Sequence, residues 1–278
     1  MDNRKIGIFD SGLGGLTVLK AVNEMIPAEG VVYFGDNGRA PYGTKSKEVI
    51  IKYTFQDINF LLSHDVKMIV IGCNTASACS LDIVKDKLKI PVVEVVEAGA
   101  EAALKRTKNK KIGIIGTSAT VGSGVYTRAI KQKDSEVEVY AKACSMFVPL
   151  VEEGWWNNDI AERICREYLE PLKEENIDTL ILGCTHYPLL QDTIQKVMGA
   201  EVTLINSATE VAKVIERTLN ELEIGCLRNE NYENDEEAEY EFFTSDSVEK
   251  FKALGSIFLG REVKKVKKAD IDGYDGNY

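Results

Sequence analysis

Two cysteines stand in surroundings that suit proton-transfer chemistry. Cys73 occurs in Gly-Cys-Asn-Thr-Ala-Ser and Cys184 occurs in Gly-Cys-Thr-His-Tyr-Pro, and each follows a short apolar run typical of a strand. Ligands of open α/β sheets bind at the carboxyl ends of the strands. Both thiols are therefore predicted to face a crevice and not the core.

A helix is expected to follow each of these turns. Asn74 or Thr75 can cap a helix that starts at Ala76, and Pro188 suits the first turn of the next helix after Cys184. The partial positive charge at a helix N-terminus favours a thiolate and lowers the pKa of a neighbouring thiol. Since Cys184 occupies the matching turn, we expect both thiols to be activated.

Opposed thiols can invert a carbon stereocentre. One thiolate removes a proton from one face while the other thiol delivers a proton to the opposite face, and the pair exchanges protonation states at each turnover. The other four cysteines (Cys79, Cys144, Cys165 and Cys226) are interpreted as small core residues. The spacing contains no C-x-x-C pair, so no metal site is predicted.

Two further side chains lie next to these turns in the sequence. Asp10 ends the first predicted strand and could hold a proton or orient the first thiol, and His186 follows Cys184 by two positions. The glycines after Asp10 (Gly12, Gly14 and Gly15) predict a tight loop that opens the helix Leu16–Met25 and either binds an anion or only turns the chain. Thr17 occupies the place of the third glycine of a dinucleotide-binding fingerprint, which makes that alternative weak.

The elements around these residues predict an α/β protein with mainly parallel sheets. Apolar residues recur at helical spacing in 47–63, 159–173 and 248–259, between short β-branched runs. The predicted strands are 5–9, 31–34, 68–72, 92–95, 112–116, 137–140, 179–183, 202–205 and 240–243.

Two of the strand ends are repeated along the chain. The segment from Lys5 resembles the segment from Lys111, at an offset of 106 residues, and the segment from Met68 resembles the segment from Thr179, at an offset of 111. Similar offsets predict two related α/β domains with a pseudo-twofold relation and the active site in the cleft between them. If the domains face each other, Cys73 and Cys184 converge.

Composition excludes several classes of protein. A net charge of −10 and a pI near 5.0 argue against a nucleic-acid partner, which would require clustered lysine and arginine. No apolar run approaches the ~20 residues that span a membrane, and the N-terminus has no export signal. A cytoplasmic location with reduced thiols is therefore expected. The acidic stretch 221–239 is interpreted as a solvated loop, and 261–268 and 270–278 as frayed surface.

Several motifs together resemble those of the glutamate racemases in the aspartate/glutamate racemase superfamily. They extend from about residue 5 to about residue 260, and their combination is far more specific than any single one. The matching segments are 7–17, 33–36, 41–43, 72–78, 113–120, 151–154 and 182–190.

The resemblance implies a role for particular residues. Cys73 would remove the proton from D-glutamate and Cys184 from L-glutamate, with Asp10 assisting Cys73, His186 assisting Cys184, and Glu152 near the site. The implied substrate contacts are mostly neutral donors and backbone amides, which suits carboxylates held without an arginine fork. They are Asp10, Ser11, Tyr42, Gly43, Asn74, Thr75, Thr117, Thr120, Thr185 and His186.

The resemblance also implies an isomerase that uses no pyridoxal phosphate, other cofactor or metal and supplies D-glutamate for peptidoglycan, hence for the cell wall and cell shape. The implied domains are 1–97 with 208–264, and 98–207, followed by a tail at 265–278. Gly72 stands where many relatives carry alanine, and the chain begins close to its first strand, so activation through an N-terminal extension is not expected. The alternatives are a racemase of aspartate or another amino acid in the same superfamily, and a binding protein without turnover. A homodimer is one possible assembly.

Overall fold

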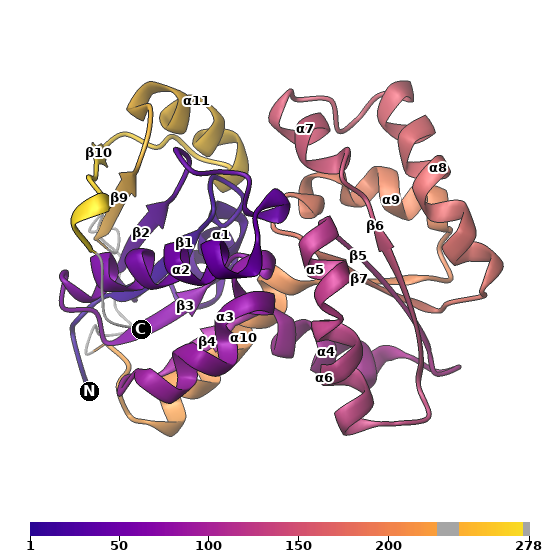
Figure 1. The fold of residues 1–278 in the computed structure, drawn as a ribbon, viewed down its shortest axis with the longest axis horizontal. Coiled ribbons are helices and arrows are strands. Elements are labelled where there is room, and N and C mark those ends of the chain that lie inside the picture. Colours follow the sequence, from indigo (N-terminus) through magenta and orange to yellow (C-terminus); the bar gives the residue numbers. More distant parts are fainter. Residues whose placement is uncertain (227–238, 275–278) are drawn as a thin grey trace.

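The computed structural model of the chain contains two parallel β-sheets, each covered by helices (Figure 1). It describes residues 1–226 and 239–274, so most of the acidic stretch, 227–238, lies outside the described residues, as does 275–278. Mixed α/β architecture with parallel sheets was the predicted fold class and is confirmed. In the described ranges, no helix has the length and apolar character needed to cross a membrane.

The larger sheet has six strands in the order β10-β9-β2-β1-β3-β4, all paired in parallel. Its three central strands are buried along their whole length, which explains their continuous apolar sequence. The strands are β1 (Ile6–Asp10), β2 (Val31–Gly35), β3 (Met68–Ile71), β4 (Val92–Glu94), β9 (Tyr240–Thr244) and β10 (Val266–Lys268).

Alternate residues of each central strand pack on opposite faces of this sheet. Ile6 and Ile8 of β1 belong to the core formed with α1 and α11, whereas Phe9 belongs to the core formed with α2 and α3. The covering helices are α1 (Leu16–Met25), α11 (Val248–Leu259), α2 (Lys47–Leu62) and α3 (Asn74–Lys87). The helices predicted at 16–25 and 248–259 are confirmed at both ends.

The smaller sheet has four strands in the order β6-β5-β7-β8, also parallel. They are β5 (Lys111–Gly116), β6 (Glu138–Ala143), β7 (Thr179–Gly183) and β8 (Thr203–Asn206). The surrounding helices and turns are α5 (Ser118–Ser123), α6 (Val125–Lys133), α7 (Phe147–Glu152), α8 (Asp159–Glu174), η2 (Tyr187–Leu190) and α9 (Gln191–Met198).

The sequence repeat corresponds to equivalent strand pairs. In the larger sheet Ile6 of β1 lies opposite Met68 of β3, and in the smaller sheet Ile112 of β5 lies opposite Thr179 of β7. These are the positions that the two offsets relate, so the repeated segments have the same register as well as similar residues. The predicted relation between the two α/β halves is therefore confirmed for these strand pairs.

Two helices connect the sheets. Helix α4 (Val95–Arg106) leads from the larger sheet to the smaller one, and α10 (Ser207–Glu221) follows the last strand of the smaller sheet. They pack against each other, and α10 also packs against α1 (Figure 1). Buried residues of both sheets therefore belong to one continuous hydrophobic core.

The C-terminal segment is more ordered than the sequence suggested. We expected 261–268 and 270–278 to be frayed surface, but β10 extends the larger sheet beside β9, and a short turn, η3 (Asp272–Tyr274), follows. Val263, Ala269 and Ile271 are buried. The prediction was wrong for 263–274 because three spaced apolar side chains suffice to anchor a mostly charged segment.

A buried ionic cluster fixes the loop between β2 and α2. The Arg39 guanidinium contacts Asp36 at 2.7 Å and Asp57 at 2.8 Å, and its carbon lies 4.1 Å from the centre of the Tyr53 ring. The Tyr42 hydroxyl lies within hydrogen-bond distance of both carboxylates and can donate its one proton to either. Because both carboxylates are fully buried, the cation is required to compensate their charge. The cluster holds Tyr42 within the 3₁₀ turn η1 (Tyr42–Thr44).

Arg39→Met is expected to lower the free energy of unfolding by about 3 kcal/mol, because it leaves two buried carboxylates without their cation. Urea denaturation measures this change. The matched control is Arg166→Met, which removes an arginine from an exposed pair with Glu162 and should cost less than about 1 kcal/mol. Equal effects of the two substitutions would contradict the assignment of Arg39 as the anchor of this loop.

Candidate functional site

Cys73 itself caps helix α3. It follows β3 directly, and its sulfur accepts a hydrogen bond from the Ala76 amide at 3.4 Å. The thiol also donates to the Ser11 hydroxyl at 3.3 Å. The helix therefore begins at Asn74, two residues earlier than predicted, and the prediction that Asn74 or Thr75 is the cap was wrong. Sulfur accepts hydrogen bonds weakly, so Cys73 gave no recognisable capping signal in the sequence.

Cys184 lies in the equivalent turn after β7, within reach of His186. The Cys184 sulfur and Nδ1 of His186 are 3.9 Å apart, and Nε2 of the same ring is 3.3 Å from the Glu152 carboxylate. Glu152 ends α7, and its side chain is 40% exposed, whereas His186 is buried. Cys184, His186 and Glu152, which were predicted separately, thus form one connected series of contacts from the sulfur to the surface.

Both cysteines line the same small inner cavity, of about 40 Å³. This prediction of convergence is confirmed by the lining residues. Eleven of the thirteen predicted site residues lie on its wall, namely Ser11, Tyr42, Gly43, Cys73, Asn74, Thr75, Thr117, Glu152, Cys184, Thr185 and His186. Asp10 and Thr120 do not line it, and both are buried behind residues that do.

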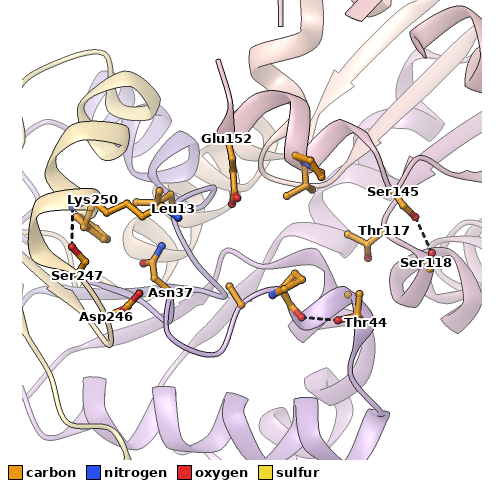
Figure 2. Close-up of a pocket in the computed structure, with 16 residues that line it drawn as sticks. Leu13, Asn37, Thr44, Thr117, Ser118, Ser145, Glu152, Asp246, Ser247 and Lys250 are labelled. Carbon is orange, nitrogen blue, oxygen red and sulfur yellow. Dashed lines mark hydrogen bonds between the residues drawn. The ribbon is translucent and has the colours of Figure 1, made fainter. Parts of the chain in front are cut away.

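A larger outer cavity of about 470 Å³ adjoins the inner one. The two share the wall residues Ala40, Pro41, Gly43, Thr117, Val148 and Glu152. Figure 2 shows Glu152 pointing into the outer cavity from α7, with Asn37 and Lys250 on one side and Thr117 on the other. The outer cavity is therefore the approach to the inner one, and Glu152 stands where they meet.

Asp10 is a fully buried carboxylate held by the glycine loop. It accepts hydrogen bonds from the Gly12 amide at 3.0 Å and from the Thr185 hydroxyl at 3.4 Å. The loop amides thus bind a carboxylate of the protein itself, so the interpretation of the loop as a turn fits better than that of a free anion site. Thr185 belongs to the smaller sheet, so Asp10 also contributes a contact between the two halves of the site.

The electrostatic environments of the two thiols differ. Burial and the nearby Asp10 carboxylate raise the pKa of Cys73 to about 12, so the predicted lowering by the helix N-terminus was wrong for the free protein. Burial would lower the pKa of His186, but contacts with Cys184 and Glu152 outweigh it and raise this pKa to about 10. The hydrogen bond with His186 lowers the pKa of Glu152. The free protein therefore has a protonated Cys73 and an imidazolium beside Cys184.

The wall between the cysteines is rich in neutral donors. The hydroxyls of Thr75 and Thr117 are 3.0 Å apart, and Thr120 lies within 3.3 Å of both. A side chain at Gly43 would come within 2.9 Å of Thr117, so the η1 turn presents bare backbone here. Tyr42 was predicted to contact the substrate, but its hydroxyl is engaged by Asp36 and Asp57. Only the rest of the residue is left to line the cavity.

Two buried residues of this region were missed from the sequence. Tyr126 of α6 donates its hydroxyl to the side chain of Asn74, and Thr17 of α1 donates to the Thr185 carbonyl at 3.1 Å. Neither lies in a turn after a strand, and each acts on a residue distant in the chain. Among residues 1–226 and 239–274 no cluster of side chains has the composition of a metal site, and all six cysteines are free.

The fold and this site match one protein family. The model of the family described as Asp/Glu/Hydantoin racemase matches residues 6–215. The chain belongs to this family.

Among its relatives, the chain is similar to glutamate racemases along nearly the whole length. It is 44% identical to the glutamate racemase of Geobacter metallireducens over 97% of both chains, and 45% identical to that of Lactococcus lactis over 99% of both. The crystal structure of glutamate racemase from Francisella tularensis in complex with D-glutamate is 38% identical, has a TM-score of 0.90, and covers 99% of this chain and 100% of that one.

The raised pKa of His186 can be measured directly, because the chain has only two histidines. In the free protein His186 should remain protonated at pH 8 and titrate near 10, as observed by NMR of isotope-labelled histidine, with His64→Gln to assign the signals. Glu152→Gln should lower this pKa, since it removes a carboxylate that favours the imidazolium. Glu153→Gln, at the next position, should leave it unchanged. Titration of His186 below pH 7 would contradict the described contacts.

Proposed function

We propose that this chain is a glutamate racemase, an isomerase that interconverts L- and D-glutamate without a cofactor. The observation that carries the proposal is the pair of cysteines at equivalent strand ends of two sheets, both on the wall of one cavity. The similarity to glutamate racemases over nearly the full chain supports glutamate as the substrate.

Inversion would proceed through one proton removal and one proton delivery at Cα. Cys184, beside the imidazolium of His186, would start as the thiolate, and Cys73, whose pKa is raised, would start as the thiol. Cys184 would then take the proton of L-glutamate while Cys73 supplies a proton to the opposite face. D-Glutamate would react in the reverse sense, starting from the opposite protonation states.

The neighbouring acids and bases would support these transfers. His186 would hold positive charge beside Cys184, and Glu152, 3.3 Å from the ring, would maintain that charge. Asp10 raises the pKa of Cys73, so Cys73 stays a thiol and has a proton to donate. Asp10 and His186 thus act on opposite sides of the cavity, and each would influence mainly one direction of the reaction.

The carboxylates and ammonium group of the substrate would be held by neutral donors and backbone groups of the cavity wall. Charge-assisted hydrogen bonds from hydroxyls and amides to a carboxylate are stronger than neutral ones, so an arginine is not required. The proposed contacts are Ser11, Tyr42 through its backbone, Gly43, Asn74, Thr75, Thr117, Thr185 and His186. Asp10 and Thr120 lie behind this wall and would act through Thr185, Thr75 and Thr117.

The proposal also includes a division of the chain into two domains. Residues 1–97 with 208–264 would form one domain and 98–207 the other, and the strand pairing of β10 favours adding the segment that follows 264 to the first. An inner cavity of about 40 Å³ is far smaller than the roughly 300–1,000 Å³ of ordinary small-molecule pockets, so glutamate could enter only if the domains separated slightly.

In the cell, the proposed product D-glutamate would serve peptidoglycan synthesis, and the enzyme would act in the cytoplasm. A homodimer also stays a prediction, which analytical ultracentrifugation would check.

Racemisation of either glutamate enantiomer is expected without pyridoxal phosphate, and circular dichroism measures it as decay of the optical signal. In deuterated water the inverted product should carry deuterium at Cα, because a thiol that exchanges with solvent supplies the new proton. Aspartate is the matched control and should react far more slowly. Faster turnover of aspartate, or activity only after addition of pyridoxal phosphate, would refute the proposed function.

Replacing either cysteine by alanine should abolish racemisation, because inversion requires a donor as well as an acceptor. Deprotonation alone requires one thiolate, and a glutamate analogue with a leaving group at Cβ can then eliminate it. Cys73→Ala should therefore still eliminate from the L-analogue and Cys184→Ala from the D-analogue. Cys165→Ala, at a buried cysteine of α8, is the control that should retain racemisation. Equal elimination from both enantiomers by both active-site variants would exclude two opposed bases.

A further inference from the structure

Tyr126 connects the two halves of the site through a buried hydrogen bond. Its hydroxyl donates to Oδ1 of Asn74 at 2.6 Å, and the two residues are 2% and 3% exposed. Asn74 begins α3 beside the larger sheet, whereas Tyr126 lies in the first turn of α6 beside the smaller one (Figure 1). Gly124, with φ of +65°, makes the sharp turn between α5 and α6 that places Tyr126 there.

The other end of the Asn74 side chain has no partner among the residues that the structure describes. Its Nδ2 is buried without a hydrogen-bond acceptor, although the residue lines the inner cavity between Cys73 and Cys184. A buried N–H group without an acceptor is costly, so an unpaired amide on a residue of the cavity wall indicates a ligand that supplies an acceptor. A substrate carboxylate is an acceptor of the right charge and size.

The Tyr126 hydroxyl determines which way this amide faces. Burial, together with the Glu94 carboxylate, raises the Tyr126 pKa well above its ordinary value, so the hydroxyl keeps its proton. While that proton is donated to Oδ1, Nδ2 is directed away from Tyr126 and remains without an acceptor. Without the hydroxyl, the amide could rotate and present either end to the substrate.

We propose that Tyr126 is a positioning residue that orients the Asn74 amide toward a substrate carboxylate, so that substrate affinity depends on contact between the two halves. The proposal rests on the proposed function for the identity of the ligand. It assigns a role to a residue that does not itself line the cavity and acts through one that does.

Tyr126→Phe keeps the ring and removes only the hydroxyl. The KM for both glutamate enantiomers should rise about 10-fold, with kcat changed less than about 3-fold, because the variant weakens binding and leaves both thiols in place. Tyr240→Phe is the matched control, since it also removes a tyrosine hydroxyl that donates to an asparagine Oδ1, that of Asn23, away from both cavities. It should lower thermal stability to a similar degree and leave KM unchanged.

A double-substitution cycle tests whether Tyr126 acts through Asn74. Asn74→Ala alone should raise KM at least as much as Tyr126→Phe, and Tyr126→Phe should add nothing further in the Asn74→Ala background. Independent, multiplicative effects, or an unchanged KM in Tyr126→Phe, would overturn the proposal.

Calorimetric titration of D-glutamate separates this proposal from the proposed function. If the wild-type chain binds D-glutamate without racemising it, the proposed function fails, and the Kd of Tyr126→Phe still decides the role of Tyr126. An increase of about 10-fold in Kd supports the role, and an unchanged Kd overturns it.

Discussion

Close packing between the turn after β1 and the turn after β7 sets the position of the two cysteines. A side-chain carbon at Gly14 would lie 2.2 Å from Oγ1 of Thr185 and 2.5 Å from Nδ1 of His186, so only glycine permits this approach. Thr17, in the first turn of α1, also donates to the Thr185 carbonyl. The turn that carries Cys184 is thereby fixed against the larger sheet, which carries Cys73. Two opposed thiols at one cavity follow from this contact.

One buried carboxylate has different consequences on the two sides of that cavity. Asp10 raises the pKa of Cys73, so this thiol is kept protonated, and it also contributes to the raised pKa of His186, so the imidazolium beside Cys184 is kept charged. A single negative charge therefore favours a protonated thiol on one side and an imidazolium on the other. Symmetry of the strands consequently does not imply equal electrostatic surroundings for the two thiols.

The sequence was most informative where the pattern was local. Continuous apolar runs predicted β1, β2, β3 and β7 almost to the residue, and the Gly-Cys repeats predicted equivalent turns. Strand β10 was missed because an edge strand rich in lysine lacks the apolar pattern of a buried one. The pKa of Cys73 and the partner of Asn74 depend on burial and on residues distant in the chain, which no local pattern encodes.

The groups that face the inner cavity are oriented by partners from the opposite half. The Thr75 hydroxyl contacts Thr117 and Thr120, the bare backbone of Gly43 lies against Thr117, and Asn74 accepts from Tyr126. Opening the cavity enough to admit the proposed substrate would weaken some of these contacts, since about 40 Å³ is far less than ordinary small-molecule pockets offer. On the proposed function, the polar groups would therefore reach their final orientation only as the halves meet again around the ligand. Binding and assembly of the reactive geometry would then be one event, and the free energy of the contacts between the halves would contribute to both.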